Sequence, residues 1–494
     1  MPAELLVGID LGSSGVKAVL LDPERGTLAS ALESMVLHSD HPGWAEAEPE
    51  DWWTAVRALI PRLLDDAGAQ ASDVAGVAVT GMVPAIVFCD AAGNPLRRAM
   101  LQNDARALTE IRELRDQFAG LDLLHLAGGV LTQQSIAPSA LWTARHEPQV
   151  WGQVKAVCGS YDWLARRLGA APHVELNWAL ESTLYSLDLA PIDAIVEATG
   201  LGLPPLLPVK RPGEAVGEVS AAAAVATGLA AGTPIVVGGA DHVFSAFGAG
   251  LTEPGECLVK LGGAGDIMTV SEEPVFDERL YLDHHPIPGR WMPNGCMATS
   301  GSLLRWEQTL LGGVDLAELD VAASASEPGA LLTLPYFLGE KTPLHDPELR
   351  GVVAGLTLAS TRGDLHRSLL EATAYGFRST IDIFAEDGLH VTTTYVSDGG
   401  SVSRLWREIL ASVLNRDVVT IADYPGASLG AAVAAGVGVG AIDSWSYVVG
   451  HRPHGEVTAP TPSHVARYGE RYHQFLELTD ATTSISHLIA RSTA

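Results

Sequence analysis

Lysine, cysteine and aromatic residues are scarce in this chain of 494 residues. It contains five lysines, four cysteines and 6% aromatic residues. The formal net charge is −28, because 59 acidic residues outnumber 31 basic ones. Such a surface repels nucleic acids and anionic membranes, so we expect neither as a partner. The four cysteines form no CxxC pair, which argues against structural zinc and a disulfide scaffold and favours a cytoplasmic protein.

Long apolar segments of the kind that enter membranes are also missing. No signal peptide, with its basic start and apolar centre, precedes Asp10. The uncharged run at 220–240 is interrupted by Gly232-Thr233-Pro234. Both pieces are too short to cross a bilayer, so the run predicts a buried helix and a short buried strand. Hydrophobic residues still make up 47% of the chain, which is enough for a large core.

Short apolar runs alternate with amphipathic stretches along the chain. The runs at 5–10, 16–21 and 74–80 predict buried strands, and the stretches at 51–67 and 105–118 predict helices. This alternation is typical of α/β layers. The opening pattern recurs once, since VGIDLGSSGVKAVLL at 7–21 and CLVKLGGAGDIMTV at 257–270 both indicate strand, glycine loop and strand. We therefore predict two similar α/β domains, at 1–248 and 249–480, and a polar tail at 481–494.

A glycine-rich turn follows the first predicted strand. In the segment Asp10 to Gly15, small residues let backbone N–H groups approach an anion, and Ser13 and Ser14 can donate to phosphate oxygens. The carboxylate of Asp10 at the strand end suits a hydrated Mg²⁺ that bridges phosphates. The turn matches neither the Walker A loop nor the dinucleotide fingerprint GxGxxG. An ordinary hairpin with an exposed aspartate explains the same residues, so this motif alone leaves both interpretations open.

Two later segments offer related chemistry. Gly262-Gly263-Ala264-Gly265 is a second possible phosphate loop, with Lys260 beside it. The strand at 235–237 runs through two glycines and an alanine to Asp241, where an aspartate can take the proton of a hydroxyl that attacks phosphorus. A helix N-cap is the structural alternative for Asp241. The neighbouring His242 fits a hydrogen-bonding role better than a catalytic one.

These pieces, in this order, resemble the FGGY carbohydrate kinases, and most closely their xylulokinase branch. The resemblance covers nearly the whole chain, to about residue 478. The matching stretches are GIDLGSSGVKAVLLD (8–22), HPGWAEAEPEDWW (41–53), LQNDAR (101–106), ARHEPQVW (144–151), GGADH (238–242), LGGAGD (261–266), GEKTPLHDPELRGVVAGLT (339–357), SDGGSVSRLWREIL (397–410) and SLGAAVAAG (428–436).

The resemblance implies an α/β fold of two actin-like, ribonuclease H-like domains around a deep cleft. It also implies ATP-dependent phosphorylation of a sugar or polyol hydroxyl. By position, Asp241 matches the catalytic base and Asp10 the Mg²⁺-associated acid, and ATP is expected between the two glycine-rich loops. The positions that match nucleotide-binding residues are Gly12, Ser13, Ser14, Gly262, Gly263, Gly265, Gly301, Gly400 and Arg404.

The sugar side departs from the family pattern. The expected substrate-binding residues are Met82, Val83, Pro84, Asn103, Asp104, Asp241 and His242. Xylulokinases usually carry Gln-Met-His in place of Met82-Val83-Pro84 and Trp in place of Gln102, and the second loop usually has Thr at Gly263. An apolar segment at 82–84 leaves the substrate open between xylulose and a deoxy-sugar or short polyol.

Two classes of protein remain at this point. One is a sugar or polyol kinase that acts on a small molecule, and the other is a member of the actin-like superfamily that uses nucleotide to change shape without phosphorylating a sugar. Asp241 and the motif Asn103-Asp104 favour the kinase, because a switch needs no base aimed at a hydroxyl. The oligomeric state stays open, a homodimer included.

Overall fold

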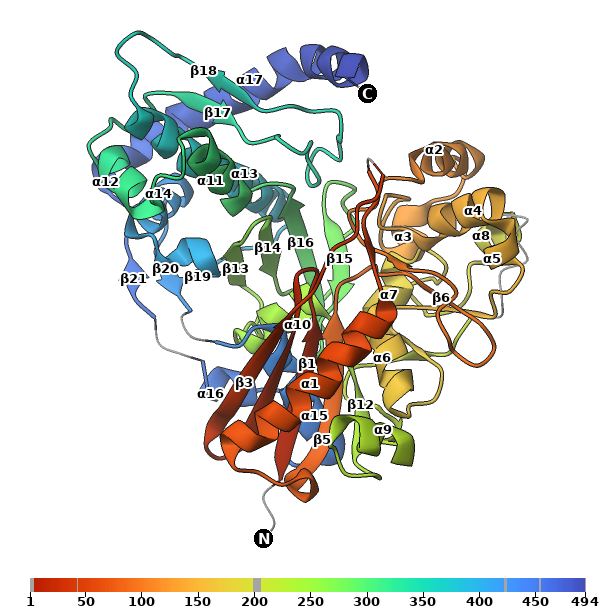
Figure 1. The fold of residues 1–494 in the computed structure, drawn as a ribbon. Helices are drawn as coiled ribbons and strands as arrows, with labels where there is room; N and C mark the ends of the chain where they lie inside the picture. Colours follow the sequence, from red (N-terminus) through yellow and green to blue (C-terminus); the bar gives the residue numbers. More distant parts are fainter. Residues whose placement is uncertain (1–3, 42, 199–205, 422–423, 453–454, 494) are drawn as a thin grey trace. The chain divides into compact units, whose positions relative to one another are not determined.

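The computed structural model describes residues 4–41, 43–198, 206–421, 424–452 and 455–493 (Figure 1). The chain forms two compact units. Unit 1 comprises Met1–Thr252, Leu282–Trp291 and Tyr424–Arg452. Unit 2 comprises Glu253–Tyr281, Met292–Asp423 and Pro453–Ala494. Each unit is described by itself.

Unit 1 is built on a six-stranded sheet whose centre is parallel. Strand β1 pairs antiparallel with β2 and parallel with β5, and β5 pairs parallel with β12. Leu6, Val7 and Ile9 of β1 are fully buried, as the apolar run predicts for a central strand. In sheet order the strands are β11 (Ala215–Glu218), β12 (Pro234–Ala240), β5 (Val74–Gly81), β1 (Leu5–Leu11), β2 (Gly15–Asp22) and β3 (Gly26–Ser34).

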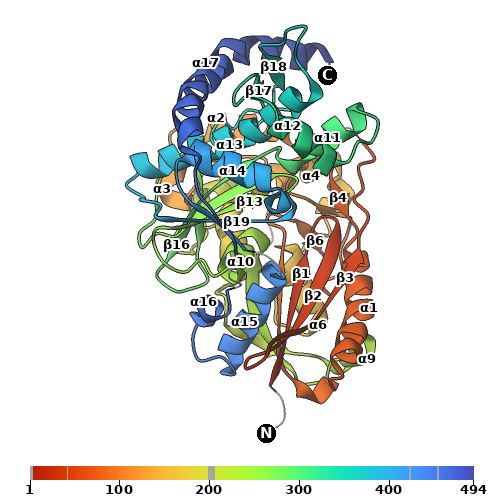
Figure 2. The same cartoon turned by 90° about the vertical axis from the view of Figure 1, so that its left-hand side faces the viewer.

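Helices cover both faces of this sheet (Figure 2). One face carries α1 (Pro49–Ala67) and α6 (Ser160–Leu168), and the other carries α10 (Asp241–Gly248) and α15 (Ala427–Val439). Helix α15 lies so close to β1 that a Cβ atom on Gly8 would overlap the carbonyl oxygen of Ser428. The Ala- and Gly-rich sequence of α15 permits this close approach.

Unit 2 repeats the arrangement. Its central strand β13 pairs antiparallel with β14 and parallel with β19, and β19 pairs parallel with β20. Helices α13 (Arg362–Glu386), α14 (Arg404–Leu414) and α17 (Pro462–Thr493) form the core with them. In sheet order the strands are β15 (Tyr281–His284), β16 (Trp291–Met297), β14 (Gly265–Thr269), β13 (Glu256–Leu261), β19 (Thr393–Ser397), β20 (Val418–Thr420) and β21 (Val457–Thr458). All of β15 after Tyr281, and the first residue of β16, are counted with unit 1.

The pairing around β1 and the pairing around β13 are the same, which confirms the predicted α/β fold with two related domains. The division of the chain is less simple than one boundary at 248/249. The first switch between units falls at Thr252/Glu253, but residues 282–291 and 424–452 return to unit 1. For residues 424–452 the physical reason is that α15 packs against β1, β5 and β12, and residues 282–291 are held to α7 by hydrogen bonds between Asn177 and His284. The predicted tail at 481–494 is helical through Thr493, as the end of α17.

Shorter elements complete the two units. Those of unit 1 are β4 (Glu46–Ala47), β6 (Val87–Cys89), β7 (Ala99–Met100), α2 (Leu108–Gln117), α3 (Leu123–Ala127), α4 (Ile136–His146), α5 (Pro148–Trp151), β8 (Ala156–Cys158), β9 (Val174–Glu175), α7 (Leu176–Glu181), α8 (Asp193–Ala198), β10 (Val209–Lys210), α9 (Ala221–Thr227) and α16 (Tyr447–Gly450), with a 3₁₀ turn at Ala71–Asp73. Those of unit 2 are α11 (Gly301–Leu310), α12 (Leu316–Ser324), β17 (Leu332–Leu334) and β18 (Val352–Ala354), with a 3₁₀ turn at Gly399–Val402.

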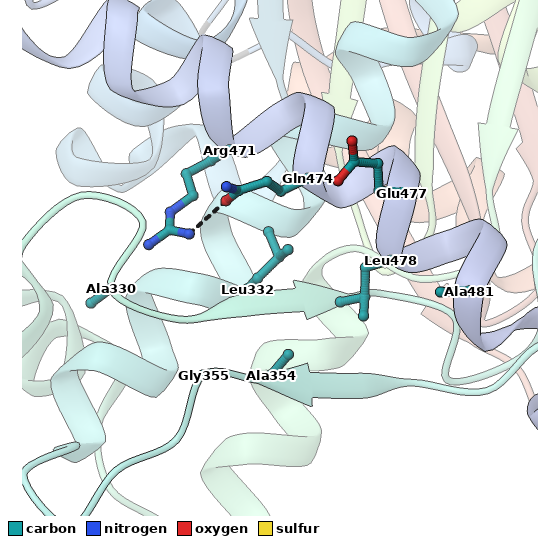
Figure 3. A pocket seen from close by; sticks show the side chains of 9 residues that line it. All are labelled: Ala330, Leu332, Ala354, Gly355, Arg471, Gln474, Glu477, Leu478 and Ala481. Carbon is teal, nitrogen blue, oxygen red and sulfur yellow. Dashed lines mark hydrogen bonds between the residues drawn. The ribbon is translucent and has the colours of Figure 1, made fainter.

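A cavity of about 450 Å³ lies in unit 2 between α17 and the β17–β18 hairpin (Figure 3). Arg471 and Gln474 of α17 are joined by a hydrogen bond of 2.6 Å at its edge, and Leu332 and Leu478 form its apolar part. None of the predicted site residues lines this cavity. Within the described ranges, no helix has the length and apolar character needed to cross a membrane.

Candidate active site

The parallel strands of unit 1 bring the predicted reactive residues to one edge of the sheet. Asp10 of β1 is in register with Thr80 of β5, and Thr80 is in register with Gly239 of β12. The carboxyl ends of the three strands therefore lie together, and the chain continues from them into Gly12, Met82 and Asp241. Open α/β sheets place their ligands at such an edge.

Asp241 is the first residue of α10 and follows β12 directly. Its side chain is 31% exposed, so a ligand in water can reach it. The backbone N–H of His242 donates to Asp241 Oδ1 at 2.6 Å, which fixes the direction of the carboxylate. The N-cap position of α10 is Ala240, which makes no side-chain capping hydrogen bond, so Asp241 is not the N-cap of this helix.

His242 is the centre of a polar cluster in unit 1. Its Nε2 lies 2.8 Å from Asp283 Oδ2, and its Nδ1 lies 3.7 Å from Asp241 Oδ1. One ligand atom each of Glu181, His242 and Asp283 lie within 4.8 Å of one another. Burial alone would lower the pKa of His242, but the charges of Asp283 and Asp241 outweigh burial and raise this pKa well above its ordinary value. Burial and the charge of Asp283 raise the pKa of Glu181 well above its usual range.

The first glycine loop joins β1 to β2 in a tight turn. The N–H of Gly12 donates to the carbonyl oxygen of Gly15 at 2.9 Å, and Ser13 and Ser14 are exposed at the tip. Thr80 Oγ1 lies 3.3 Å from Asp10 Oδ1, so a hydroxyl from β5 holds the Asp10 carboxylate at the sheet edge. Two exposed hydroxyls and a half-buried carboxylate are what the sequence predicts for phosphate and magnesium ligands.

The second loop occupies the equivalent place in unit 2, with the charges reversed. In β1 and β2 the cross-strand neighbours are Asp10 and Lys17, whereas in β13 and β14 they are Lys260 and Asp266. Lys260 Nζ lies 3.6 Å from Asp266 Oδ2 and 4.0 Å from Asp398 Oδ2. The end of β13 thus presents a cation where the end of β1 presents an anion, so the two loops are related in shape but differ in their charge.

Gly301 and Arg305 of α11 close around the second loop. The N–H of Gly301 donates to Gly262 O at 2.7 Å, and a Cβ atom on Gly301 would lie 2.7 Å from the same oxygen. Arg305 Nη2 lies 2.6 Å from the place that a Cβ atom on Gly263 would occupy. A guanidinium group therefore stands where the family usually has a threonine side chain, and it is a stronger donor to phosphate than a hydroxyl.

Gly400 and Arg404 lie near the start of α14. A Cβ atom on Gly400 would be 2.6 Å from the Cβ of Leu261, so only glycine fits beside the end of β13. The side chain of Arg404 is 80% exposed, and its Nε donates to Glu408 at 2.8 Å. Gly262, Gly301 and Gly400 are thus near one another in unit 2, while Arg404 extends into solvent.

The predicted sugar-side residues fall into two groups. Met82, Val83 and Pro84 are buried at the end of β5, and the N–H of Met82 donates to Leu11 O at 3.1 Å. Asn103 is exposed. Both carboxylate oxygens of Asp104 accept hydrogen bonds.

The hydrogen bonds to the carboxylate of Asp104 come from a neighbouring loop and from an arginine. The N–H of Ala45 donates to Asp104 Oδ2 at 2.7 Å, and Arg106 donates to both oxygens at 2.6 and 2.8 Å. Arg106 also stacks on Trp44, with 3.7 Å between its guanidinium carbon and the ring centroid. Asp104 therefore anchors the loop that carries Ala45.

Comparison with known proteins identifies the family of the chain. The model of the FGGY family of carbohydrate kinases, N-terminal domain, matches residues 5–248, and the model of its C-terminal domain matches 258–439. The chain belongs to this family. It is therefore a carbohydrate kinase, which decides between the two classes that the sequence left open.

The individual relatives are kinases named for different substrates. The crystal structure of xylulose kinase from Rhodospirillum rubrum is 38% identical, covers 98% of this chain and 100% of that one, and superimposes with a TM-score of 0.89. Xylulose kinase from Staphylococcus epidermidis is 29% identical over 89% of either chain. Autoinducer-2 kinase from Yersinia enterocolitica is 30% identical over 88% of this chain and 87% of its own.

Three residues of the site region were not predicted. Asp283 and Glu181 come from β15 and α7, and each is at least forty residues from His242 in sequence. Arg305 lies one helical turn beyond Gly301, and that spacing could have pointed to it. His284 and His285 are buried near this cluster, and His284 ends β15. Burial lowers the pKa of both to about 4, so they are neutral.

Proposed function

We propose that this kinase transfers the γ-phosphoryl group of ATP to a hydroxyl of a sugar or polyol, with Asp241 as the general base. The observation that supports this role is the register of β1, β5 and β12, which gathers Asp10 and Asp241 at the carboxyl edge of one sheet. Asp241 is partly exposed and its Oδ1 is oriented by a backbone amide. It accepts the proton of the hydroxyl while the oxygen attacks phosphorus.

The phosphates are bound by the two glycine loops in this proposal. Gly12, Ser13 and Ser14 supply backbone amides and hydroxyls, and Gly262–Gly265 supply a second set of amides with Arg305 beside them. Asp10 fits Mg²⁺, because it is an oxygen donor that remains accessible enough to hold a hydrated ion. When bound, Mg²⁺ neutralises charge on the phosphates.

The family indicates that the substrate is a carbohydrate, but it does not indicate which sugar or polyol is phosphorylated. Relatives at 38% and 29% identity are named for xylulose and one at 30% is named for autoinducer-2, so the names of the relatives do not by themselves fix the substrate. We propose a xylulokinase-like reaction in which the apolar segment Met82–Pro84 favours a deoxy-sugar or a short polyol over xylulose.

The Asp241→Asn variant tests the general base. The substitution keeps the shape of the side chain and removes its basicity, so we expect kcat for ADP release to fall by at least about 100-fold. ATP binding, measured by calorimetry, should change little. Asp122→Asn is the matched control, because Asp122 is an exposed aspartate of the same unit outside the site. A folded Asp241→Asn enzyme with near-normal kcat would contradict the assignment.

A further inference from the structure

The imidazole of His242 lies between two carboxylates that differ in exposure. Asp283 is 1% exposed, and its Oδ2 lies 2.8 Å from Nε2 of His242. Asp241 is 31% exposed, and its Oδ1 lies 3.7 Å from Nδ1 of His242. An imidazole that is protonated on both nitrogens is hydrogen-bonded to Asp283 and brings its positive charge to within 3.7 Å of Asp241 Oδ1, a charge contact beyond hydrogen-bond distance. A neutral imidazole can still donate to Asp283 but presents no charge to Asp241.

The position of Asp283 is fixed by a pair of hydrogen bonds in the buried interior of unit 1. Asn177 Nδ2 donates to His284 O at 3.0 Å, and the N–H of His284 donates to Asn177 Oδ1 at 2.7 Å. This pair joins α7, which carries Glu181, to β15, which carries Asp283. The cluster around His242 is therefore held by the backbone of two elements and is not formed by mobile side chains alone.

The charged groups that face His242 come from three elements. They are Asp241 on α10, Asp283 on β15 and Glu181 on α7. Burial and the charge of Asp283 raise the pKa of Glu181, and Asp283 and Asp241 raise the pKa of His242 against the opposing effect of burial. A protonated His242 compensates a buried charge at Asp283 and faces the carboxylate of Asp241.

We propose that His242 is a positioning residue for phosphoryl transfer, which, anchored by Asp283 and Glu181, keeps the Asp241 carboxylate ionised and oriented toward the attacking hydroxyl. This inference rests on the proposed role of Asp241 as the base. The proton leaves the hydroxyl for Asp241, and His242 keeps both of its protons throughout. The cation ensures that Asp241 is a carboxylate when the substrate binds. A base held in the correct orientation accelerates the reaction far more than a base that is only close to the substrate.

The His242→Asn variant removes the cation and leaves Asp283 uncompensated beside the base. We expect Asp241 to become harder to ionise, so kcat at pH 6 should be at least about tenfold below kcat at pH 8, while the wild-type profile stays flat over this range. The fall in kcat at pH 6 should exceed any rise in KM for the sugar, because the variant alters the reacting step more than binding. The exposed His125 pairs with Asp122 in the same unit, so His125→Asn is the matched control.

The double variant His242→Asn with Asp283→Asn separates charge from structure. It removes the cation and the buried anion together, so the low-pH loss of kcat should disappear and the profile should again be flat. Replacing both partners of a buried pair is also far less damaging to folding than removing one. A double variant that repeats the pH profile of His242→Asn would overturn the proposal, and so would a His242→Asn enzyme with the wild-type profile.

Two further measurements need no turnover. Histidine titration followed by NMR should show His242 titrating well above its ordinary pKa of about 6.5 in the wild type and near 6.5 in Asp283→Asn. A wild-type His242 that titrates near 6.5 would overturn the proposal. So would purified enzyme that carries one equivalent of a transition metal removable by EDTA, because a metal would take the place of the proton.

These outcomes separate the inference from the proposed function. Should the wild-type enzyme phosphorylate no sugar or polyol, the proposed function fails while the NMR titration still decides whether His242 is held as a cation. Should the enzyme be active and lose activity in Asp241→Asn, but show no pH effect in His242→Asn, only the inference fails.

Discussion

Met82, Val83 and Pro84 follow β5 at the sheet edge that carries Asp10 and Asp241. None of the three side chains has a hydrogen-bonding group, and Pro84 also lacks a backbone N–H. A hydroxyl buried against this segment would lose one or two partners, at a cost of about 1–3 kcal/mol each. A methyl group or a deoxy carbon would lose nothing there.

We therefore expect D-xylulose to be a poor substrate. In a panel of pentuloses, deoxy-sugars and C3–C5 polyols, at least one deoxy-sugar or short polyol should show a kcat/KM at least about tenfold higher than D-xylulose. Coupled ADP release with each compound at the same enzyme concentration measures this. The interpretation of the segment is wrong if D-xylulose is the best substrate, with a kcat/KM of about 10⁴ M⁻¹s⁻¹ or more.

The residues of the site show how far sequence alone can go. Asp10, Asp241 and the two glycine loops could be predicted because each lies in a contiguous motif whose chemistry is local. Asp283 and Glu181 could not, since neither has a motif of its own and only the packing of β15 and α7 brings them to His242. Arg305 was not predicted, because it reaches the second loop only where Gly263 has no side chain.

At the scale of elements, one buried histidine connects four helices of unit 2. His366 of α13 lies 2.6 Å from Glu307 of α11 through Nδ1 and 2.9 Å from Asp320 of α12 through Nε2. Asp320 also accepts a hydrogen bond from Ser403, the N-cap of α14. Burial alone would lower the pKa of His366, but hydrogen bonds to Asp320 and Glu307 raise it to about 9.

This network makes stability depend on pH. Because the folded pKa of His366 exceeds the unfolded value of about 6.5, its contribution is complete below pH 6.5 and is lost as pH rises through 9. The shift corresponds to a contribution of up to about 3 kcal/mol. We expect the difference in unfolding free energy between wild type and His366→Gln to shrink from pH 6 to pH 9.5.

Urea denaturation at several pH values measures this difference. The comparison with the variant is needed because Asp162, Glu175 and Glu340, whose pKa values burial raises to about 8, also destabilise the folded state as pH rises. His473→Gln, on α17 of the same unit, serves as the control. A wild-type advantage that stays constant over this range would contradict the role of His366.

The elements themselves were largely predictable, and their contacts were not. The strand at Thr393–Ser397 and the helix α17 agree with the apolar periodicity of the sequence, and the stripe of Tyr468, Tyr472 and Phe475 in the first half of α17 is buried as core. The partner of α15 could not be predicted, because a helix of Ala, Gly and Val has no polar face to indicate its orientation. The close contact between α15 and Gly8 of β1 is what places this helix in unit 1.

At the scale of the whole molecule, unit 1 is assembled from three separate parts of the chain. A fragment of residues 1–248 lacks α15 and would expose the face of β1, β5 and β12 that this helix covers. We expect this fragment to unfold without a cooperative transition in urea, as followed by circular dichroism. A chain in which residues 1–252 are joined to 424–452 by a flexible linker should recover part of the cooperativity. Cooperative unfolding of residues 1–248 alone would show that α15 is dispensable.

The late position of α15 has a consequence for how the protein is made. The ribosome releases β1, β5 and β12 early, but the helix that covers them is synthesised only after most of unit 2. At about 5–20 residues per second, the interval is on the order of ten to forty seconds. During that time an apolar sheet face is exposed in the nascent chain, and we expect a chaperone that binds apolar surfaces to associate with ribosomes that have passed residue 252 and not yet reached 439.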